Sequence, residues 1–272
     1  MNSRGGRKMK LSFIGCGNMG SAMLKGILAK GIVAKEDIIV SEIAQETLKS
    51  TCDELGVYGT VDNKEAVRSS DIIVLAVKPQ YYEAVIEAIR DEVDESQIIV
   101  SIAPGKTLAW LEDTFGKSVK VVRTMPNTPA LVQAGMTGVC ANDKVSQAEF
   151  EQVLRLLVGF GEVEEVEEHL MDVVTAVSGS SPAYIFMLIE AMADAAVAGG
   201  MPRAQAYRFA SQAVLGSAKL VLETGRHPGE LKDMVCSPGG TTIEAVRVLE
   251  EKGMRSSIIE AMKACVNKAK GL

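Results

Sequence analysis

The residues best suited to chemistry lie near the start of the chain, in the glycine-rich loop 15–20. An apolar run over 10–14 leads into this loop, and an amphipathic helical pattern follows it. Gly15 permits a tight turn, Gly17 lets the backbone approach a pyrophosphate, and Gly20 allows the helix to pack closely on the strand. The N-terminus of the helix then offers unpaired N–H groups to an anion. Because strand, loop and helix follow in this order, we predict a dinucleotide-binding site.

Ser41 and Glu42 follow the next apolar run, 38–41. An acidic residue about twenty positions after the glycines normally binds the adenosine ribose hydroxyls and repels a 2′-phosphate, which favours NAD. Two alternatives stay open. Ser41 could donate a hydrogen bond to a phosphate, and Glu42 could be an ordinary acid near a helix N-terminus.

Three more loops follow apolar runs, at 76–79, 101–105 and 123–129. In an open α/β sheet such loops lie at the edge where ligands bind. Pro79 stops its strand, and the small Ala76 suits a backbone that lies against a flat cofactor. Two prolines make the last loop a rigid ledge. Each loop is also compatible with an ordinary strand end or structural turn.

The turn 237–242 is a candidate carboxylate site in the second half of the chain. Two consecutive glycines permit unusual backbone angles there. Thr241 and Glu244 have the spacing of a capping box, which predicts Thr241 as the N-cap of the next helix. The Thr242 hydroxyl would then be free beside unpaired N–H groups, where a small carboxylate could dock. The alternative is a capped turn between two helices.

The composition narrows the function classes. A net charge of −6 and an aromatic content of 4% over 272 residues give no reason to expect nucleic acid or an anionic membrane as partner. The five cysteines show no CxxC spacing, so we expect reduced thiols in a cytoplasmic protein and no zinc site. With only 2 histidines, no metal cluster is predicted.

No targeting or membrane segment is predicted. The first ten residues are basic but lack an apolar core, so we expect no signal peptide. The most apolar stretch, 183–198, carries Glu190 and Asp194, so we expect no transmembrane span. These two acids share one helix face, and we interpret them as polar partners across a helix interface rather than as a paired-carboxylate site.

Alternating strand and helix patterns predict a doubly wound, parallel α/β sheet in the first part of the chain. The acidic segment 162–168 is typical of a solvated edge strand and linker. We therefore predict a Rossmann domain over 1–168 and an all-helical domain over 169–272. The expected strands are 10–14, 38–41, 72–76, 98–102, 119–123 and 137–141, and the expected helices are 19–30, 44–54, 80–90, 106–114, 146–158, 170–177, 182–198, 203–223, 228–234, 241–251 and 254–270.

The helix expected over 182–198 is apolar nearly all round. Such a helix must be buried on several sides. A helical domain of about a hundred residues can bury part of it, and a dimer partner would bury more.

Five motifs occur in a fixed order along the chain: Gly15-x-Gly17-x-Met19-Gly20, Ala76-Val77-Lys78-Pro79, Met125-Pro126-Asn127-Thr128-Pro129, Ser178-Gly179-Ser180-Ser181-Pro182-Ala183-Tyr184 and Ser237-Pro238-Gly239-Gly240-Thr241-Thr242. Together they resemble the pyrroline-5-carboxylate reductase family, from about Met9 to the C-terminus. The third and fifth motifs are far more specific than the glycine loop, which alone is a weak signal.

The resemblance implies a Rossmann domain, a helical domain that forms a homodimer, and a ring of dimers that is often a decamer. It implies hydride transfer from NADP(H) or NAD(H) to the C=N bond of 1-pyrroline-5-carboxylate, giving L-proline without a metal. Two other functions remain alternatives: a related imine or hydroxyacid reductase, and a non-enzymatic NAD(P)H-binding redox sensor.

The resemblance also assigns residues. Backbone amides around Gly240 and Thr241 would hold the substrate carboxylate, and the Thr242 hydroxyl, the catalytic assignment, would bond the ring nitrogen. The other substrate contacts would be Val177, Ser178, Gly179, Ser180, Ser237 and Gly239. The cofactor contacts, from motifs and strand ends together, would be Gly15, Gly17, Asn18, Met19, Gly20, Ser41, Glu42, Asn63, Ala76, Val77, Lys78, Pro79, Ser101, Ala103, Met125 and Asn127.

Two residues depart from the family pattern. Ser181 stands where the family usually has glycine, and its hydroxyl either narrows the turn near the substrate or caps the helix that starts at Pro182. Glu42 is the second departure, because the family commonly prefers NADPH and an acid at this position disfavours it.

Overall fold

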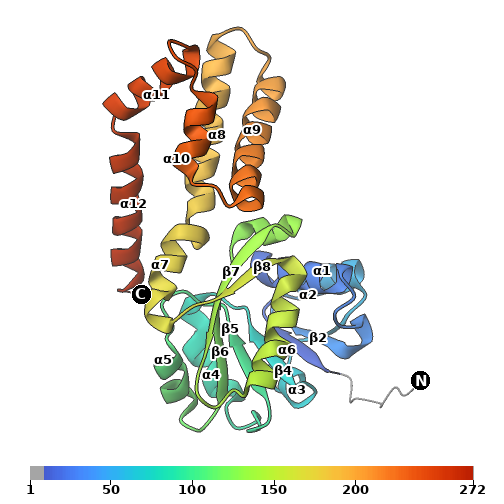
Figure 1. Cartoon of the computed structure of the whole chain (residues 1–272). Coiled ribbons are helices and arrows are strands. Elements are labelled where there is room, and N and C mark those ends of the chain that lie inside the picture. The colour runs from blue at the N-terminus through green and yellow to red at the C-terminus, as the bar shows by residue number, and fades with distance from the viewer. Residues whose placement is uncertain (1–8, 272) are drawn as a thin grey trace, which may run out of the picture. The chain divides into compact units, whose positions relative to one another are not determined.

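A computed structural model describes residues 9–271, so the predictions made for the first eight residues lie outside it. The chain forms an eight-stranded sheet in the order β3-β2-β1-β4-β5-β6-β7-β8, followed by a run of helices (Figure 1). The strands are β1 (Leu11–Ile14), β2 (Ile38–Ser41), β3 (Tyr58–Thr60), β4 (Ile72–Leu75), β5 (Ile98–Ser101), β6 (Lys120–Met125), β7 (Gly135–Ala141) and β8 (Gly161–Glu165).

The predicted doubly wound sheet is confirmed, with one antiparallel pair. All neighbouring strands run parallel except β6 and β7, which pair antiparallel with Arg123 opposite Cys140. The connection between these two strands holds only a short 3₁₀ turn, Thr128–Val132, and no crossover helix, so the chain returns in the opposite direction. The predicted acidic edge strand is β8.

Helices cover both faces of the sheet because strand side chains alternate between two apolar cores. Phe13 and Val74 belong to the core that contains α1 and α6, whereas Ile73 and Leu75 belong to the core that contains α4 and α5. The helices that follow the strands are α1 (Asn18–Ala29), α2 (Gln45–Leu55), α3 (Asn63–Arg68), α4 (Tyr82–Ile89), α5 (Leu108–Phe115) and α6 (Gln147–Leu157), with 3₁₀ turns at Lys35–Asp37, Pro79–Tyr81 and Val158–Phe160.

Sequence reasoning missed β3 and gave no helix range over α3. The strand is only three residues long, and its Tyr58 is 58% exposed, so it shows neither an apolar run nor a clear alternation. It pairs with β2 through Tyr58 opposite Ile39. The six-residue helix α3 that follows is too short to show a helical period.

The rest of the chain is helical, as predicted. Contacts divide the chain into two compact units, one of residues up to 180 together with 266 onward, the other of 181–265. We call them the sheet unit and the helical unit. The helices after the sheet are α7 (Met171–Val174), α8 (Ser181–Ala198), α9 (Arg203–Thr224), α10 (Pro228–Val235), α11 (Thr241–Glu251) and α12 (Met254–Ala269), with a 3₁₀ turn at Glu168–Leu170 and a π-helical turn at Thr175–Gly179.

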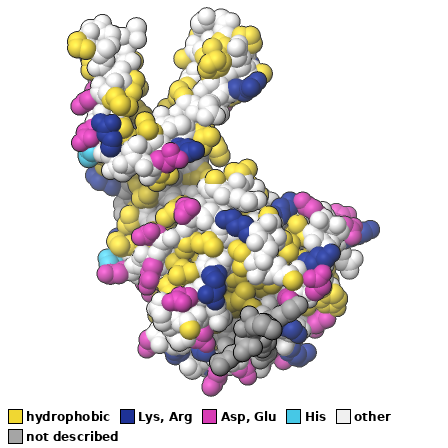
Figure 2. Space-filling view, turned by 45° about the vertical axis from the view of Figure 1, so that its right-hand side comes forward, with side chains coloured by type: hydrophobic (Ala, Val, Ile, Leu, Met, Phe, Trp, Pro, Cys, Tyr) yellow, Lys and Arg dark blue, Asp and Glu magenta, His cyan; other side chains and the backbone are white. Residues whose placement is uncertain are grey.

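The single chain buries only a small part of α8. Only Pro182 and Ala193 of this helix are buried, while Phe186 is 62% and Met187 68% exposed. Two long helices, α8 and α9, pack on each other and leave much apolar surface uncovered. Figure 2 shows exposed apolar side chains along the helical part and charged side chains over the sheet-containing part.

Helix α8 also bears on the membrane prediction. By length and composition alone, the helical stretch 168–198 could cross a membrane. Asp194 in this stretch forms an ion pair with Arg203 of α9, within the helical unit. The same composition is found in helices that subunits bury against each other.

Candidate functional site

The glycine loop has the geometry that its sequence predicts. Gly15 adopts a φ of +94°, and its N–H donates to the Ser41 carbonyl at 2.8 Å. A Cβ on Gly15 would lie 2.9 Å from the backbone of Ala76, and one on Gly20 would lie 2.8 Å from the Gly15 carbonyl oxygen. These two glycines are therefore required by close packing between β1, α1 and the loop after β4.

Gly17 differs from its two neighbours because a Cβ there would meet no atom within 4 Å. It is the N-cap residue of α1, with no side chain to cap the helix. The first N–H groups of α1 lack partners within the helix and face open space. A pyrophosphate fits this position, because the N–H groups and the positive end of the helix dipole attract it.

Two cavities in the sheet unit meet at the glycine loop and share Gly17, Ala76, Val77 and Lys78. The first, which we call the Glu42 cavity, is also lined by Ile14, Gly15, Ser41, Glu42, Ile43, Asn63, Tyr81, Ala84, Val85 and Ala88. The second, the Asn127 cavity, is also lined by Asn18, Met19, Pro79, Ile102, Ala103, Pro104, Met125, Pro126, Asn127, Thr128 and Gly179. Most of the predicted cofactor residues therefore lie on two adjoining surfaces.

Glu42 is held in place by backbone N–H groups. Its Oε2 accepts from the Cys16 N–H and its Oε1 accepts from the Ala44 N–H, each at 3.1 Å. The neighbouring Ser41 is fully buried, and its hydroxyl donates to Asn63 Oδ1 at 2.6 Å. The carboxylate is thus fixed beside the loop, while the Ser41 hydroxyl already has a partner. Lys78 is the one cation among the described residues that line the two cavities.

Ser101 lies beneath the cavities and lines neither of them. It is fully buried, and its hydroxyl donates to the Tyr82 hydroxyl at 3.3 Å. The Tyr82 hydroxyl donates to the Leu75 carbonyl and accepts from the Ile102 N–H at 3.2 Å. Burial raises the pKa of Tyr82 to about 12, so this hydroxyl stays protonated and ties β4 to β5. Of the predicted cofactor residues, Ser101 and Gly20 therefore support the cavity walls from behind.

The ledge after β6 contacts the π-helical turn in the same unit. The Asn127 amide nitrogen donates to the Ser178 carbonyl at 3.0 Å, and its Oδ1 accepts from the Met136 N–H at 2.9 Å. A Cβ on Gly179 would lie 2.8 Å from the Met125 methyl carbon. Of the predicted substrate residues near here, Gly179 lines the Asn127 cavity, whereas Val177, Ser178 and Ser180 do not.

The turn before α11 is the predicted carboxylate site in the helical unit. Gly239 adopts a φ of +67°, and a Cβ on Gly240 would clash with the Ser237 hydroxyl. The Gly240 N–H donates to the Ser237 carbonyl at 3.0 Å, closing the turn. The positive φ favours glycine at 239, and the helix N-terminus has no side-chain cap.

The capping box predicted at this turn is wrong. Helix α11 begins at Thr241, and its N-cap is Gly240, without a side-chain cap. Glu244 pairs with Arg247 at 2.8 Å instead of reaching back. Because the glycines allow the helix to start one residue earlier, Thr241 lies inside it. The Thr242 hydroxyl makes no hydrogen bond to another described residue, so it is available to a ligand.

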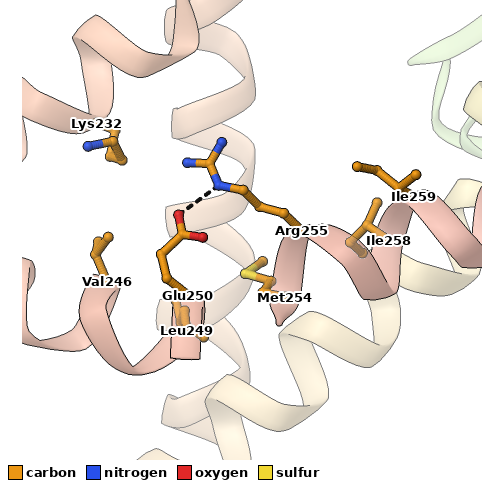
Figure 3. A pocket seen from close by; sticks show the side chains of 8 residues that line it. All are labelled: Lys232, Val246, Leu249, Glu250, Met254, Arg255, Ile258 and Ile259. Carbon is orange, nitrogen blue, oxygen red and sulfur yellow. Dashed lines mark hydrogen bonds and ion pairs between the residues drawn. The ribbon is translucent and has the colours of Figure 1, made fainter. Parts of the chain in front are cut away.

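The helical unit also carries an apolar groove between α10, α11 and α12 (Figure 3). Val246, Leu249, Met254, Ile258 and Ile259 line it, and an ion pair of 2.7 Å between Glu250 and Arg255 lies at its side. Ile259 is 52% exposed and Leu249 48%.

Sequence reasoning missed the wall of the Glu42 cavity that α4 provides. Ala84, Val85 and Ala88 line it, Tyr81 of the preceding 3₁₀ turn lies beside them in the lining, and Ile43, also in the lining, is 81% exposed. The signal was available: a pair of alanines four residues apart on a helix leaves room for a flat ring. Among residues 9–271, no three His, Cys, Asp or Glu side chains gather as a metal site requires. None of the five cysteines forms a disulfide.

A Rossmann-type sheet whose glycine loop opens into two adjoining cavities defines the class of dinucleotide-dependent oxidoreductases. The comparisons with known proteins agree. Residues 168–272 match the family described as "Pyrroline-5-carboxylate reductase dimerisation", and residues 10–105 match "NADP oxidoreductase coenzyme F420-dependent". The chain belongs to the pyrroline-5-carboxylate reductase family, and it is an NAD(P)H-dependent oxidoreductase.

Individual relatives cover nearly the whole chain. The chain is 53% identical to the pyrroline-5-carboxylate reductase of Escherichia coli over 97% of its own length and 98% of the relative's. The solved structure of such a reductase from Coxiella burnetii is similar with a TM-score of 0.91, at 36% identity and covering 97% of this chain and 98% of that one. That of Plasmodium falciparum pyrroline carboxylate reductase, solved with NADP bound, has a TM-score of 0.89 at 33% identity, covering 97% of each chain.

Proposed function

We propose that this chain reduces the C=N bond of 1-pyrroline-5-carboxylate to give L-proline, with the residues assigned from the sequence as its site. The observation that carries this proposal is the turn 237–242. Gly240 is the N-cap of α11, and the helix N-terminus there has no capping side chain. A ligand carboxylate suits such a terminus, because it satisfies N–H groups that no protein atom caps.

The substrate contacts follow from this turn. The backbone amides of Gly240 and Thr241 hold the carboxylate, while Ser237 and Gly239 shape the turn. The Thr242 hydroxyl bonds the ring nitrogen and is the catalytic residue. Val177, Ser178, Gly179 and Ser180 contribute the second set of substrate contacts. An imine that is protonated in water is already a good hydride acceptor, so these groups chiefly supply position and electrostatics.

The cofactor assignment rests on the two cavities of the sheet unit. The glycine loop holds the pyrophosphate, and Glu42 lies where the adenosine ribose binds in this fold. Met125 and Ala103 line the Asn127 cavity, whose mostly small and apolar wall suits the nicotinamide ring. The reduced nicotinamide supplies the hydride when it is bound. Lys78, common to both cavities, offsets the negative charge of the phosphates.

We further propose the assembly and location of the protein. A dimerisation domain and exposed apolar side chains such as Phe186 (62%) support a homo-oligomer. A decamer built from dimers is the larger assembly. We assign 1–168 to the dinucleotide domain and 169–272 to substrate binding and dimerisation. The uncovered face of α8 then meets a second subunit and not a membrane, and the free thiols suit the cytoplasm.

The first test follows the absorbance of the reduced nicotinamide with 1-pyrroline-5-carboxylate and either NADPH or NADH. Substrate-dependent oxidation is expected. If neither cofactor is oxidised although both bind, the remaining candidates are another imine, a hydroxyacid, or a redox-sensor function. Those outcomes are separated by offering the same protein other cyclic imines with the reduced cofactor, and hydroxyacids with the oxidised cofactor.

A further inference from the structure

The helical chain is interrupted at Ser178, and the interruption leaves a carbonyl without its usual partner. Residues Thr175–Gly179 form a π-helical turn, in which the Ser180 N–H donates to the Thr175 carbonyl at 2.8 Å. In a regular helix the Ser178 carbonyl would accept from the residue four positions on. That residue is Pro182, which has no N–H. This partly buried carbonyl therefore calls for a donor from elsewhere in the chain.

Asn127 supplies the donor from a distant part of the chain. Its amide nitrogen donates to the Ser178 carbonyl at 3.0 Å, and its Oδ1 accepts from the Met136 N–H at 2.9 Å. The side chain is 8% exposed, and prolines at 126 and 129 restrict the backbone on both sides. Each end of this amide therefore already makes one hydrogen bond to protein, which fixes the orientation of the side chain.

We propose that Asn127 is a positioning residue that locks the segment 177–180 onto the ledge 125–128. Asn127 and Gly179 line the same cavity, so this bond fixes the substrate segment relative to the wall against which the nicotinamide lies. The Met125 side chain packs on Gly179 and adds a second contact. The inference rests on the proposed function, and it replaces the direct cofactor contact expected of Asn127 from the sequence.

The test compares Asn127→Asp and Asn127→Ala with the unaltered full-length protein. Asn127→Asp keeps an acceptor for the Met136 N–H but loses the donor to Ser178. For both variants we expect kcat/KM for 1-pyrroline-5-carboxylate to fall about 30-fold, mostly through KM, because a displacement of about 1 Å costs up to 100-fold. The Kd of the reduced dinucleotide should stay within about threefold of the unaltered value.

Asn142 provides a matched control in the same unit. It is also buried, and its amide donates to the Val119 carbonyl at 2.9 Å and accepts from the Val121 N–H at 3.1 Å, but it lines neither cavity. Asn142→Asp should lower Tm at least as much as Asn127→Asp and retain kcat/KM per folded enzyme.

Several outcomes overturn the positioning role. One is a kcat/KM within about threefold of the unaltered enzyme for both Asn127 variants. A fall in kcat/KM in Asn127→Asp but not in Asn127→Ala would show that the added charge causes the effect. An equal weakening of dinucleotide and substrate would make Asn127 a cofactor contact, and an equal loss in Asn142→Asp would make the effect one of stability. Absence of turnover in the unaltered protein would instead refute the proposed function.

Discussion

The sheet unit and the helical unit bury their apolar residues to very different degrees. In the sheet unit, core residues such as Ile73 and Leu75 are 0% exposed. In the helical unit, Phe186 and Met187 on the longest apolar helix are 62% and 68% exposed. The sheet covers its strands with its own helices, whereas the helical unit needs another surface to cover its own. Dinucleotide binding and assembly are therefore assigned to different parts of the chain.

The largest expected effect comes from a charged substitution on the exposed apolar face of α8. Met187→Glu places a carboxylate where we expect a second subunit, and burying an unpaired charge costs several kcal/mol. We expect dissociation and a loss of turnover of about 100-fold, corresponding to roughly 2.7 kcal/mol. Sedimentation velocity and the NADPH oxidation assay measure the two effects.

Val132→Glu is the matched control, because Val132 is an equally exposed apolar residue of the sheet unit, at 76%. It should leave the assembly and turnover close to their original values. Dinucleotide binding by Met187→Glu should also persist, since both cavities are lined by the sheet unit alone. An intact oligomer with full turnover in Met187→Glu would show that this face is not the interface.

The two units also differ in how much their sequences reveal. Strand periodicity and the glycine loop predicted the sheet well, because each strand alternates between two cores. The short strand Tyr58–Thr60 was not predicted because it has no apolar pattern. In the helical unit the helix positions were predicted, but the N-terminus of α11 was not. The start of a helix depends on whether glycine lets the chain turn one residue earlier, which periodicity does not report.

The residues of the site also differed in how well the sequence predicted them. Loops after parallel strands converge by topology, so the residues 76–79 and Met125 could be placed at one edge from sequence. Hydrogen bonds between distant side chains could not be predicted. The bond from Ser41 to Asn63 and that from Asn127 to Ser178 depend on tertiary contacts across 22 and 51 positions.

Thr242→Ala tests the catalytic assignment in the helical unit. Removing a hydrogen bond to the ring nitrogen should lower kcat by about 10-fold to 100-fold. Dinucleotide affinity should not change, because both cavities belong to the sheet unit. Ser257→Ala, which truncates an exposed hydroxyl on α12, serves as the control. Unchanged turnover in Thr242→Ala would refute the assignment, whereas lost dinucleotide binding would mean that the two units do not divide the ligands as proposed.

Glu42→Gln sharpens the comparison within the sheet unit by testing cofactor choice. The carboxylate is fixed by the N–H groups of Cys16 and Ala44 and so cannot turn away from a 2′-phosphate. Removing its charge should raise the ratio of kcat/KM for NADPH to that for NADH by about tenfold. Glu46→Gln removes the same charge from the first turn of α2, outside the cavity, and should leave the ratio unchanged. Equal shifts in both variants would indicate a general effect of net charge.

The smallest expected effect is on the free energy of unfolding, and it compares one ion pair in each unit. Glu112 of the sheet unit pairs with Lys144, and their side chains are 27% and 32% exposed, whereas Glu244 and Arg247 of the helical unit are 65% and 58% exposed. The hydrogen bond from Lys144, then one from Asn142, lowers the pKa of the Glu112 carboxyl below its usual range. A carboxyl with a depressed pKa in the folded state stabilises the fold above its unfolded pKa, and this contribution is lost as pH falls through the folded pKa.

Glu112→Gln should therefore lower the free energy of unfolding by about 1 kcal/mol at pH 7. The difference from the unaltered protein should shrink as the pH falls from the unfolded pKa of glutamate, about 4.3, through the lower pKa of the folded carboxyl. Glu244→Gln should change the free energy by only a few tenths of a kcal/mol at either pH, because solvent screens an exposed pair. Urea unfolding at both pH values measures these differences. Glu112→Gln could instead lower the free energy of unfolding by the same amount at acid and neutral pH. The loss would then come from poorer packing of the amide. The ion pair would in that case stabilise the sheet unit no more than its exposed counterpart stabilises the helical unit.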